Sequence, residues 1–230
     1  MSTTRRKLLR SAALTGGGLA VGGGALAAHA PKAAPGGDPA GLLALFAKRQ
    51  TVRRYKMDPV PDEHLRLILD AARRPPTCMN QQPWKFLVVR DKAKIERMRA
   101  RTMELALKYA ETAATPAERE ARKAYMVGLT EGYFTAPLYV VVLTDSECPC
   151  AGYNMHDGPM AAAYLMLAAR ALGYGTAYLT DGIPDLVTRE VLAIPSRYKR
   201  VCITPIGVPD GWPEPKPKKK LEELVAYETL

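Results

Sequence analysis

The chain has 230 residues, of which 47% are hydrophobic and 24% are charged. This composition is typical of one globular domain with enough length to bury a core. The formal charge of +10 suits a phosphate, a nucleic acid or an acidic surface equally well, so it identifies no partner. Basic and aromatic residues are not interleaved, which argues against a nucleic-acid partner.

The first thirty residues have the pattern of an export signal. A basic start with adjacent arginines, Thr4–Arg10, precedes a weakly apolar stretch, Ala12–Ala27, and the small–x–small tripeptide Ala28-His29-Ala30. Glycines dilute the apolar stretch, whereas a membrane anchor needs roughly 20 strongly apolar residues. We therefore predict a twin-arginine signal peptide over residues 1–30 and an exported, periplasmic protein. An ordinary secretory leader or an unstructured start remains the alternative.

The predicted leader affects both the net charge of the mature chain and the expectation of a cofactor. Without its four basic residues the formal charge falls from +10 to +6. The twin-arginine route carries folded proteins and is commonly used where a cofactor is inserted in the cytoplasm. The leader therefore suggests a bound cofactor.

Periodicity and turn residues predict the elements that follow. Residues 31–40 are rich in Pro, Gly and Ala and predict a flexible linker before a single domain over residues 41–230. A helix is expected over Gly41–Lys48. Asp62 is the predicted cap of a helix through Arg74 whose apolar face holds Leu65, Ile68, Leu69 and Ala72.

Strands and helices alternate in the rest of the chain, without internal repeats, which predicts an α/β or α+β class. The run Leu138–Leu143 is continuously apolar, as in a strand buried on both faces. The other expected elements are strands over 85–89, 176–179 and 200–206 and helices over 92–113, from Thr115-Pro116 onward and over 155–172. His64 is expected on a helix surface.

Two polar segments carry candidate chemistry. Arg49–Tyr55 lies between a helix and a turn, and its arginine forks and threonine hydroxyl suit a terminal phosphate. A solvated basic surface is the alternative. The segment Pro75–Trp84 gathers Thr and amide side chains that can pair with the edge of a heteroaromatic ring. A polar turn whose amides satisfy its own backbone is the alternative there.

Taken together, these segments resemble the FMN-dependent nitroreductase family, from about Leu42 to Val225. The resemblance also rests on the order of several further motifs, namely Asp58–Asp62, Lys85–Val89, Ala136-Pro137, Ala168–Thr176, Ile206–Pro209 and Pro215–Lys218. It implies an α+β nitroreductase-like fold with a central, mainly antiparallel sheet flanked by helices. It also implies a homodimer with two FMN sites between the subunits, and the apolar helix 155–172 would suit the centre of that dimer. A monomer core helix is the alternative.

The resemblance assigns FMN-binding residues in four groups. The first group contacts the phosphate and the polar edge of the flavin and consists of Arg49, Gln50, Thr51 and Arg53. The second is a turn that often reaches the partner's flavin, with Pro76, Thr77, Asn80 and Gln82. The third lies beneath the isoalloxazine ring and consists of Leu179, Thr180, Asp181 and Gly182, and the fourth binds phosphate through Lys216 and Lys218. Lys218 replaces the family's arginine and Cys78 its usual small residue.

The activity implied is reduction of a small organic acceptor (a nitroaromatic, a quinone or a flavin-like molecule) in ping-pong fashion, with no catalytic side chain assigned. A specialised relative (a reductive dehalogenase or a flavin-fragmenting enzyme) and a non-catalytic FMN electron relay are the alternatives. The stretch 97–135 is a candidate lid. NADH or NADPH is the family's usual electron donor. Because both are scarce outside the cytoplasm, a membrane quinol or a small redox protein is also considered.

Three cysteines leave further alternatives open. Cys148 and Cys150, with His156 nearby, form at most part of a metal site, and no metal is predicted. A disulfide with Cys202 or across subunits is a second possibility in an oxidising compartment. Free thiols are the third.

Overall fold

A computed structural model describes residues 37–230. The predicted signal peptide and most of the predicted linker lie outside these residues. Within them, no helix is both long enough and apolar enough to cross a membrane. The domain begins with α1 (Pro39–Lys48), two residues earlier than expected, and Asp38 caps it by accepting a hydrogen bond from the Gly41 N–H.

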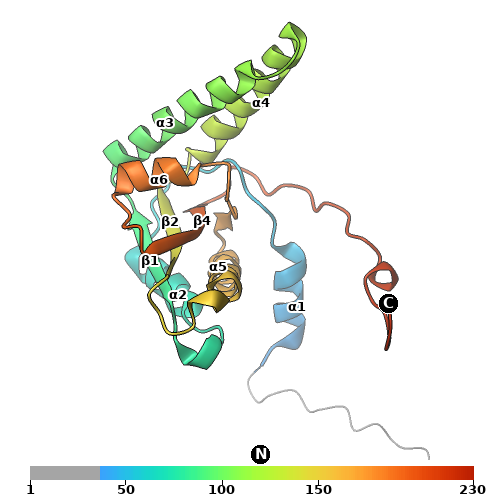
Figure 1. The fold of residues 1–230 in the computed structure, drawn as a ribbon. Coiled ribbons are helices and arrows are strands. Elements are labelled where there is room, and N and C mark those ends of the chain that lie inside the picture. Colours follow the sequence, from blue (N-terminus) through green and yellow to red (C-terminus); the bar gives the residue numbers. More distant parts are fainter. Residues whose placement is uncertain (1–36) are drawn as a thin grey trace, which may run out of the picture. The chain divides into compact units, whose positions relative to one another are not determined.

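The centre of the domain is a four-stranded sheet in the order β1-β2-β4-β3, and every neighbouring pair is antiparallel (Figure 1). The strands are β1 (Trp84–Val89), β2 (Leu138–Asp145), β3 (Gly175–Thr176) and β4 (Tyr198–Gly207). The predicted α+β class and antiparallel sheet are therefore confirmed, as is the buried strand expected at Leu138–Leu143.

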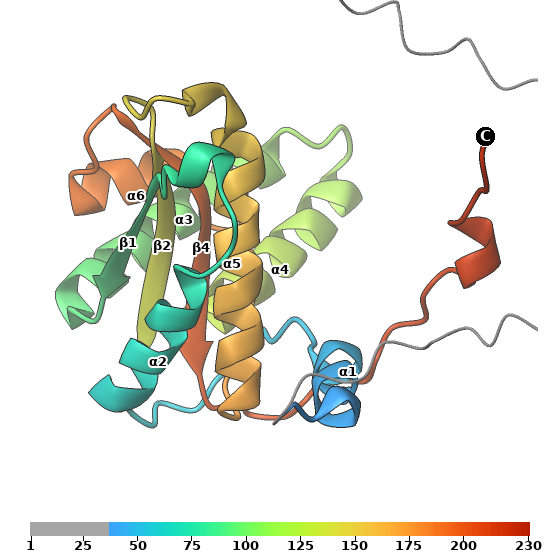
Figure 2. The ribbon, with the colours of Figure 1, turned by 90° about the horizontal axis from the view of Figure 1, so that it is seen from below.

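Helices cover both faces of the sheet, which explains why β2 is apolar at every position. Side chains alternate between faces along a strand. Val140 and Val142 point to the core beneath α2 (Asp62–Ala72) and α5 (Asn154–Ala171). Tyr139 and Val141 point to the core beneath α3 (Lys92–Glu111), α4 (Pro116–Tyr133) and α6 (Asp185–Leu192). Figure 2 shows α2 and α5 side by side on one face.

Three local expectations were wrong. Asp62 does not cap α2 with its side chain; Pro61 occupies the cap position, and the Asp62 carboxylate pairs with Arg90 instead. His64 is half-buried, with Nδ1 2.7 Å from the hydroxyl of Tyr174. The strand expected over 176–179 ends at Thr176.

The backbone of β4 explains why β3 is short. Thr176 pairs with Ile206, and Leu179 pairs with Ile203 in the same register. The gap between these two pairs lies beside Pro205, which has no N–H to donate to a neighbouring strand. The chain therefore continues along β4 without forming a regular ladder.

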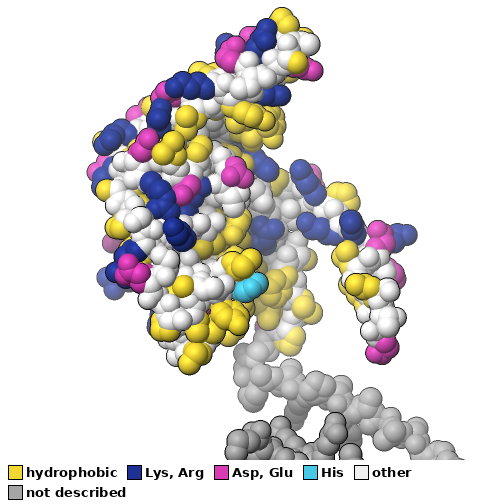
Figure 3. Space-filling model, viewed as in Figure 1, with side chains coloured by type: hydrophobic (Ala, Val, Ile, Leu, Met, Phe, Trp, Pro, Cys, Tyr) yellow, Lys and Arg dark blue, Asp and Glu magenta, His cyan; other side chains and the backbone are white. Residues whose placement is uncertain are grey.

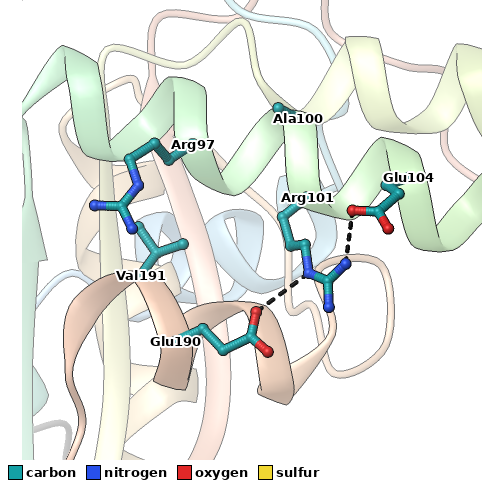
Figure 4. A pocket seen from close by; sticks show the side chains of 6 residues that line it. All are labelled: Arg97, Ala100, Arg101, Glu104, Glu190 and Val191. Carbon is teal, nitrogen blue, oxygen red and sulfur yellow. Dashed lines mark hydrogen bonds and ion pairs between the residues drawn. The ribbon is translucent and has the colours of Figure 1, made fainter.

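The stretch 97–135 is mostly a helical hairpin of α3 and α4 that projects from the sheet (Figure 1). The predicted start of α4 is confirmed. Thr115 accepts a hydrogen bond from the Glu118 N–H, and the Glu118 carboxylate accepts one from the Thr115 N–H, each at 3.2 Å. Arg101 forms ion pairs with Glu104 on its own helix, α3, and with Glu190 on α6, beside a cavity of about 330 Å³ (Figure 4). The residues around this cavity therefore connect α3 to α6.

One face of α5 is buried in this chain and the other is exposed. Ala161, Leu165 and Ala169 are buried against the sheet, whereas Met160 and Tyr164 are exposed. The C-terminal segment is also exposed from residue 210 onward and leaves the body of the domain (Figures 1 and 2). It contains a single turn, η3 (Leu221–Glu223).

Candidate cofactor site

Backbone hydrogen bonds bring the basic N-terminal segment against the start of the C-terminal segment. The Val52 N–H donates to the Thr176 carbonyl at 2.9 Å, which places residues 49–53 beside β3. The Lys56 N–H donates to Val208 at 2.8 Å, and the Asp210 N–H donates to Arg54 at 3.1 Å. The Trp212 ring stacks on the Arg170 guanidinium, whose Cζ lies 3.5 Å from the ring centroid.

These contacts form a cavity of about 130 Å³. It is lined by Arg49, Gln50, Thr51, Arg53, Pro213, Glu214, Lys216 and Lys218. Four cations, a hydroxyl and an amide face one carboxylate, a donor set that fits a phosphate group. Figure 3 shows Lys and Arg side chains gathered where the C-terminal segment leaves the body. Pockets for drug-sized ligands span about 300–1,000 Å³, so this cavity suits only the phosphate end of a molecule such as FMN.

Tyr133 connects this cavity with the segment Leu179–Gly182. The Arg53 Nε donates to the Tyr133 hydroxyl at 3.3 Å. A Cβ atom at Gly182 would lie 3.0 Å from Cε2 of Tyr133, so the position has little room for a side chain. Leu179 is buried, whereas Thr180 and Asp181 are exposed, with the Thr180 hydroxyl 3.1 Å from the Asp181 carboxylate.

Arg200 holds the same segment from inside the protein. Its side chain is 5% exposed, and its guanidinium donates to the carbonyls of Ile183, at 2.7 Å, and Thr180. Its Nε lies 3.3 Å from the Asp185 carboxylate. Burial lowers the pKa of Arg200 from its usual value, an effect that the Asp185 charge opposes. Sequence reasoning missed Arg200, although a cation next to an apolar strand was a usable signal.

The turn around Pro76, Thr77, Asn80 and Gln82 includes η1 (Cys78–Asn80) and has a constrained backbone. Asn80 and Gln82 have φ values of 56° and 48°, in the left-handed region that side chains disfavour. The Gln82 N–H donates to the Thr77 hydroxyl at 3.1 Å, and the Gln82 amide lies 3.2 Å from Asn80 Oδ1. Several polar groups of this turn therefore satisfy one another, while Pro76, Asn80 and Gln82 remain exposed.

The turn and the cavity lie at opposite ends of the sheet. Trp84, just after the turn, pairs with Thr144, whereas Leu138 pairs with Ile206 beside β3. These two pairs are six residue steps apart along β2, which corresponds to about 20 Å. One chain thus brings the first and fourth groups of predicted residues together in the cavity and links the third group to Arg53 through Tyr133. The Pro76–Gln82 turn lies apart from the cavity.

The cysteines do not form the metal site considered above. Across residues 37–230, no three or more His, Cys, Asp or Glu side chains are grouped to hold a metal ion. All four cysteines are free, and Cys202 is fully buried in β4.

The chain resembles known proteins both in sequence and in fold. The model of the nitroreductase family matches residues 46–208. The iodotyrosine deiodinase of Thermotoga neapolitana is 32% identical over 199 residues, covering 82% of this chain and 98% of the relative. The 5,6-dimethylbenzimidazole synthase of Rhodospirillum rubrum is 31% identical over 195 residues, covering 80% and 88%.

Among solved structures, an oxidised iodotyrosine deiodinase bound to FMN and 3-iodo-L-tyrosine superposes with a TM-score of 0.70. It is 27% identical, and the match covers 82% of this chain and all of that one. An FMN-dependent nitroreductase from Clostridium difficile R20291 has a TM-score of 0.62 and 26% identity, covering 82% and 99%. The chain belongs to the nitroreductase family.

Proposed function

We propose that this protein is an FMN-dependent oxidoreductase that reduces a small organic acceptor. The observation that carries the proposal is the cavity in which Arg49, Thr51 and Arg53 meet Lys216 and Lys218. FMN, which similar solved structures contain, ends in a phosphate of the size and charge that this cavity suits. When bound, FMN would accept electrons from a donor and pass them to the acceptor.

The chain's own residues would bind and orient this group. The two arginines offer planar forks to the phosphate, and the lysines add positive charge that favours its anionic form. Arg200 holds the carbonyls of Thr180 and Ile183 in place, in the segment that the resemblance places beneath the flavin ring. Donor and acceptor would use one site in turn, which predicts ping-pong kinetics.

We further propose that the working form is a homodimer. In one chain the predicted flavin turn and the cavity lie at opposite ends of β2, about 20 Å apart along the strand. The turn of a second chain would then complete the site. Exposed apolar side chains provide a surface for that contact. They are Leu42, Leu43 and Phe46 on α1, Met160 and Tyr164 on α5, and Leu221, Leu224 and Tyr227 in the C-terminal segment.

A charge on the exposed face of α5 should disrupt this dimer. Tyr164→Asp is expected to raise the dimer dissociation constant at least about 100-fold, since an unpaired carboxylate in an apolar contact is strongly unfavourable. FMN affinity should fall with it. Light scattering coupled to size-exclusion chromatography measures the assembly. Leu67→Asp, at an exposed position of α2, is the matched control and should leave the dimer intact. A wild-type protein that is monomeric at micromolar concentration contradicts the proposal.

Two specialised relatives, the iodotyrosine deiodinase and the 5,6-dimethylbenzimidazole synthase, suggest different reactions. Their sequence identities to this chain, 32% and 31%, are too similar to favour one of them. The FMN-loaded protein should therefore be reduced without oxygen and mixed with 3-iodotyrosine, a quinone or a nitroaromatic compound, and reoxidation followed at 450 nm. Release of iodide at a rate far above that for the quinone would assign a dehalogenase. Failure of every acceptor to reoxidise the protein would contradict reduction of a small organic acceptor and leave the flavin-fragmenting enzyme and the electron relay.

The choice of electron donor depends on whether the protein is exported, because NADH and NADPH are scarce outside the cytoplasm. The twin-arginine pattern at Arg5-Arg6 supports export. We propose an exported enzyme that draws electrons from a membrane quinol or a small redox protein. Cell fractionation of the full chain checks its location. Reduction by micromolar NADPH within milliseconds would remove the reason for a separate donor.

A further inference from the structure

Two cysteines lie on neighbouring segments that one glutamine side chain holds together. Cys78 begins η1, and Cys150 immediately precedes η2 (Ala151–Tyr153). Gln81, in the same turn as Cys78, accepts a hydrogen bond from the Cys150 N–H at 2.8 Å. Its amide nitrogen donates to the Cys150 carbonyl at 3.2 Å and to the Asp157 carboxylate at 2.9 Å. Residue 150 is thus fixed beside the turn by both of its backbone polar groups.

The thiols of this pair interact. The Cys150 thiol beside it, and then partial burial, raise the pKa of Cys78 to about 11. The Asp157 carboxylate of α5 and the Cys148 thiol also raise the pKa of Cys78, to a smaller extent. Both Cys78 and Cys150 are half-buried rather than enclosed, so a small oxidant can reach them.

The other two cysteines are engaged elsewhere. The Cys148 thiol donates to Oδ1 of Asn154 at 3.3 Å, and Asn154 in turn donates to the Asp145 carbonyl at 2.7 Å. Cys202 is fully buried between the two layers of helices. The structure therefore selects one pair of thiols, and it differs from the pairings with Cys202 that the sequence suggested.

We propose that Cys78 and Cys150 form an intramolecular disulfide that locks the Pro76–Gln82 turn to the loop between β2 and α5. The oxidant is a disulfide compound. One thiolate attacks it, forming a mixed disulfide and releasing one thiol; the second cysteine thiolate then attacks the protein-bound sulfur and releases the other thiol. The two protein thiols lose two electrons in total, and the oxidant's sulfur–sulfur bond takes them up.

Peptide mapping after oxidation tests the pairing. The full chain is reduced, freed of reductant, exposed to excess oxidised glutathione, alkylated and digested with trypsin without further reduction. We expect one link between the peptide containing Cys78 and the peptide containing Cys148 and Cys150, with the free thiols falling from four to two. The link should persist in Cys148→Ser, the matched control, and disappear in Cys150→Ser.

Three results would overturn the proposal: alkylation of Cys78 in the oxidised wild-type protein, persistence of the link in Cys150→Ser, or a link between two chains on a non-reducing gel. Where a variant fails to fold, fragmentation of the linked wild-type peptide decides the question, because the alkyl group marks whichever of Cys148 and Cys150 is not linked to Cys78. The pairing does not depend on FMN. A mapped Cys78–Cys150 link in a protein that never binds FMN would leave this inference standing and remove the proposed function.

A thermal melt measures what the bond does. Because it closes a long loop, the disulfide should raise the midpoint of unfolding by several degrees. Addition of dithiothreitol should remove this gain in the wild-type protein and in Cys148→Ser, but leave Cys150→Ser unchanged. Equal midpoints for the oxidised and reduced wild-type protein would contradict a lock on the turn.

Discussion

Replacing Lys218 with alanine should raise the dissociation constant of FMN by about 10- to 100-fold. A hydrogen bond to a charged group contributes about 1.5–3 kcal/mol, and each 1.4 kcal/mol is a factor of ten. Arg49→Ala should have an effect of similar size, since both side chains line the same cavity. Lys218→Arg should instead strengthen binding, because the planar guanidinium offers two parallel donors to a phosphate. Quenching of FMN fluorescence measures all three.

Lys219→Ala is the matched control for this series. Lys219 is adjacent and exposed, but it is not among the residues that line the cavity. Its loss should change the dissociation constant less than about twofold at physiological salt, where surface charges are screened. If Lys218→Ala and Lys219→Ala weaken binding equally, the lysines act as a general positive surface, and the cavity is not the phosphate site.

Arg200→Met should lower the free energy of unfolding by about 3 kcal/mol. The buried guanidinium donates to the carbonyls of Thr180 and Ile183, and a buried acceptor left without its partner is unfavourable by about 1–3 kcal/mol. The segment that Arg200 holds should also become mobile, so FMN affinity is expected to fall as well. Urea unfolding, monitored by circular dichroism, gives the stability change.

The control for this position is Arg99→Met. Arg99 pairs with Glu96 on the surface of α3, with both side chains exposed, and such pairs contribute about 0–1 kcal/mol. Arg200→Lys should recover only part of the stability, since a lysine has no fork to reach both carbonyls. A stability change below 1 kcal/mol for Arg200→Met would show that the segment is held by other contacts.

Local signals predicted most of the fold. The continuous apolar run Leu138–Leu143 indicated a strand covered on both faces, and Thr115-Pro116 marked the start of α4. The helix α6 was not predicted because it has only eight residues and lies between Pro184 and Ile194-Pro195, where turn signals dominate. Short elements of this kind depend on tertiary packing, here through buried Val187.

The site was only partly accessible from sequence. The donor types at Arg49–Arg53 indicated a phosphate, but the approach of Lys216 and Lys218 depends on backbone pairing between residues about 150 positions apart. Tyr133 and Arg200 likewise act through contacts distant in sequence. The proximity of Cys78 and Cys150 could not be predicted from their spacing in the sequence, because hydrogen bonds of the Gln81 side chain hold the two segments together.

Whether this chain binds FMN can be seen in the visible absorption spectrum of the purified protein. We expect a yellow protein that releases FMN on heating, about one per chain, as identified by chromatography. A colourless protein that also fails to take up added FMN would contradict the proposed function, since the cavity at Lys218 would then not bind this cofactor.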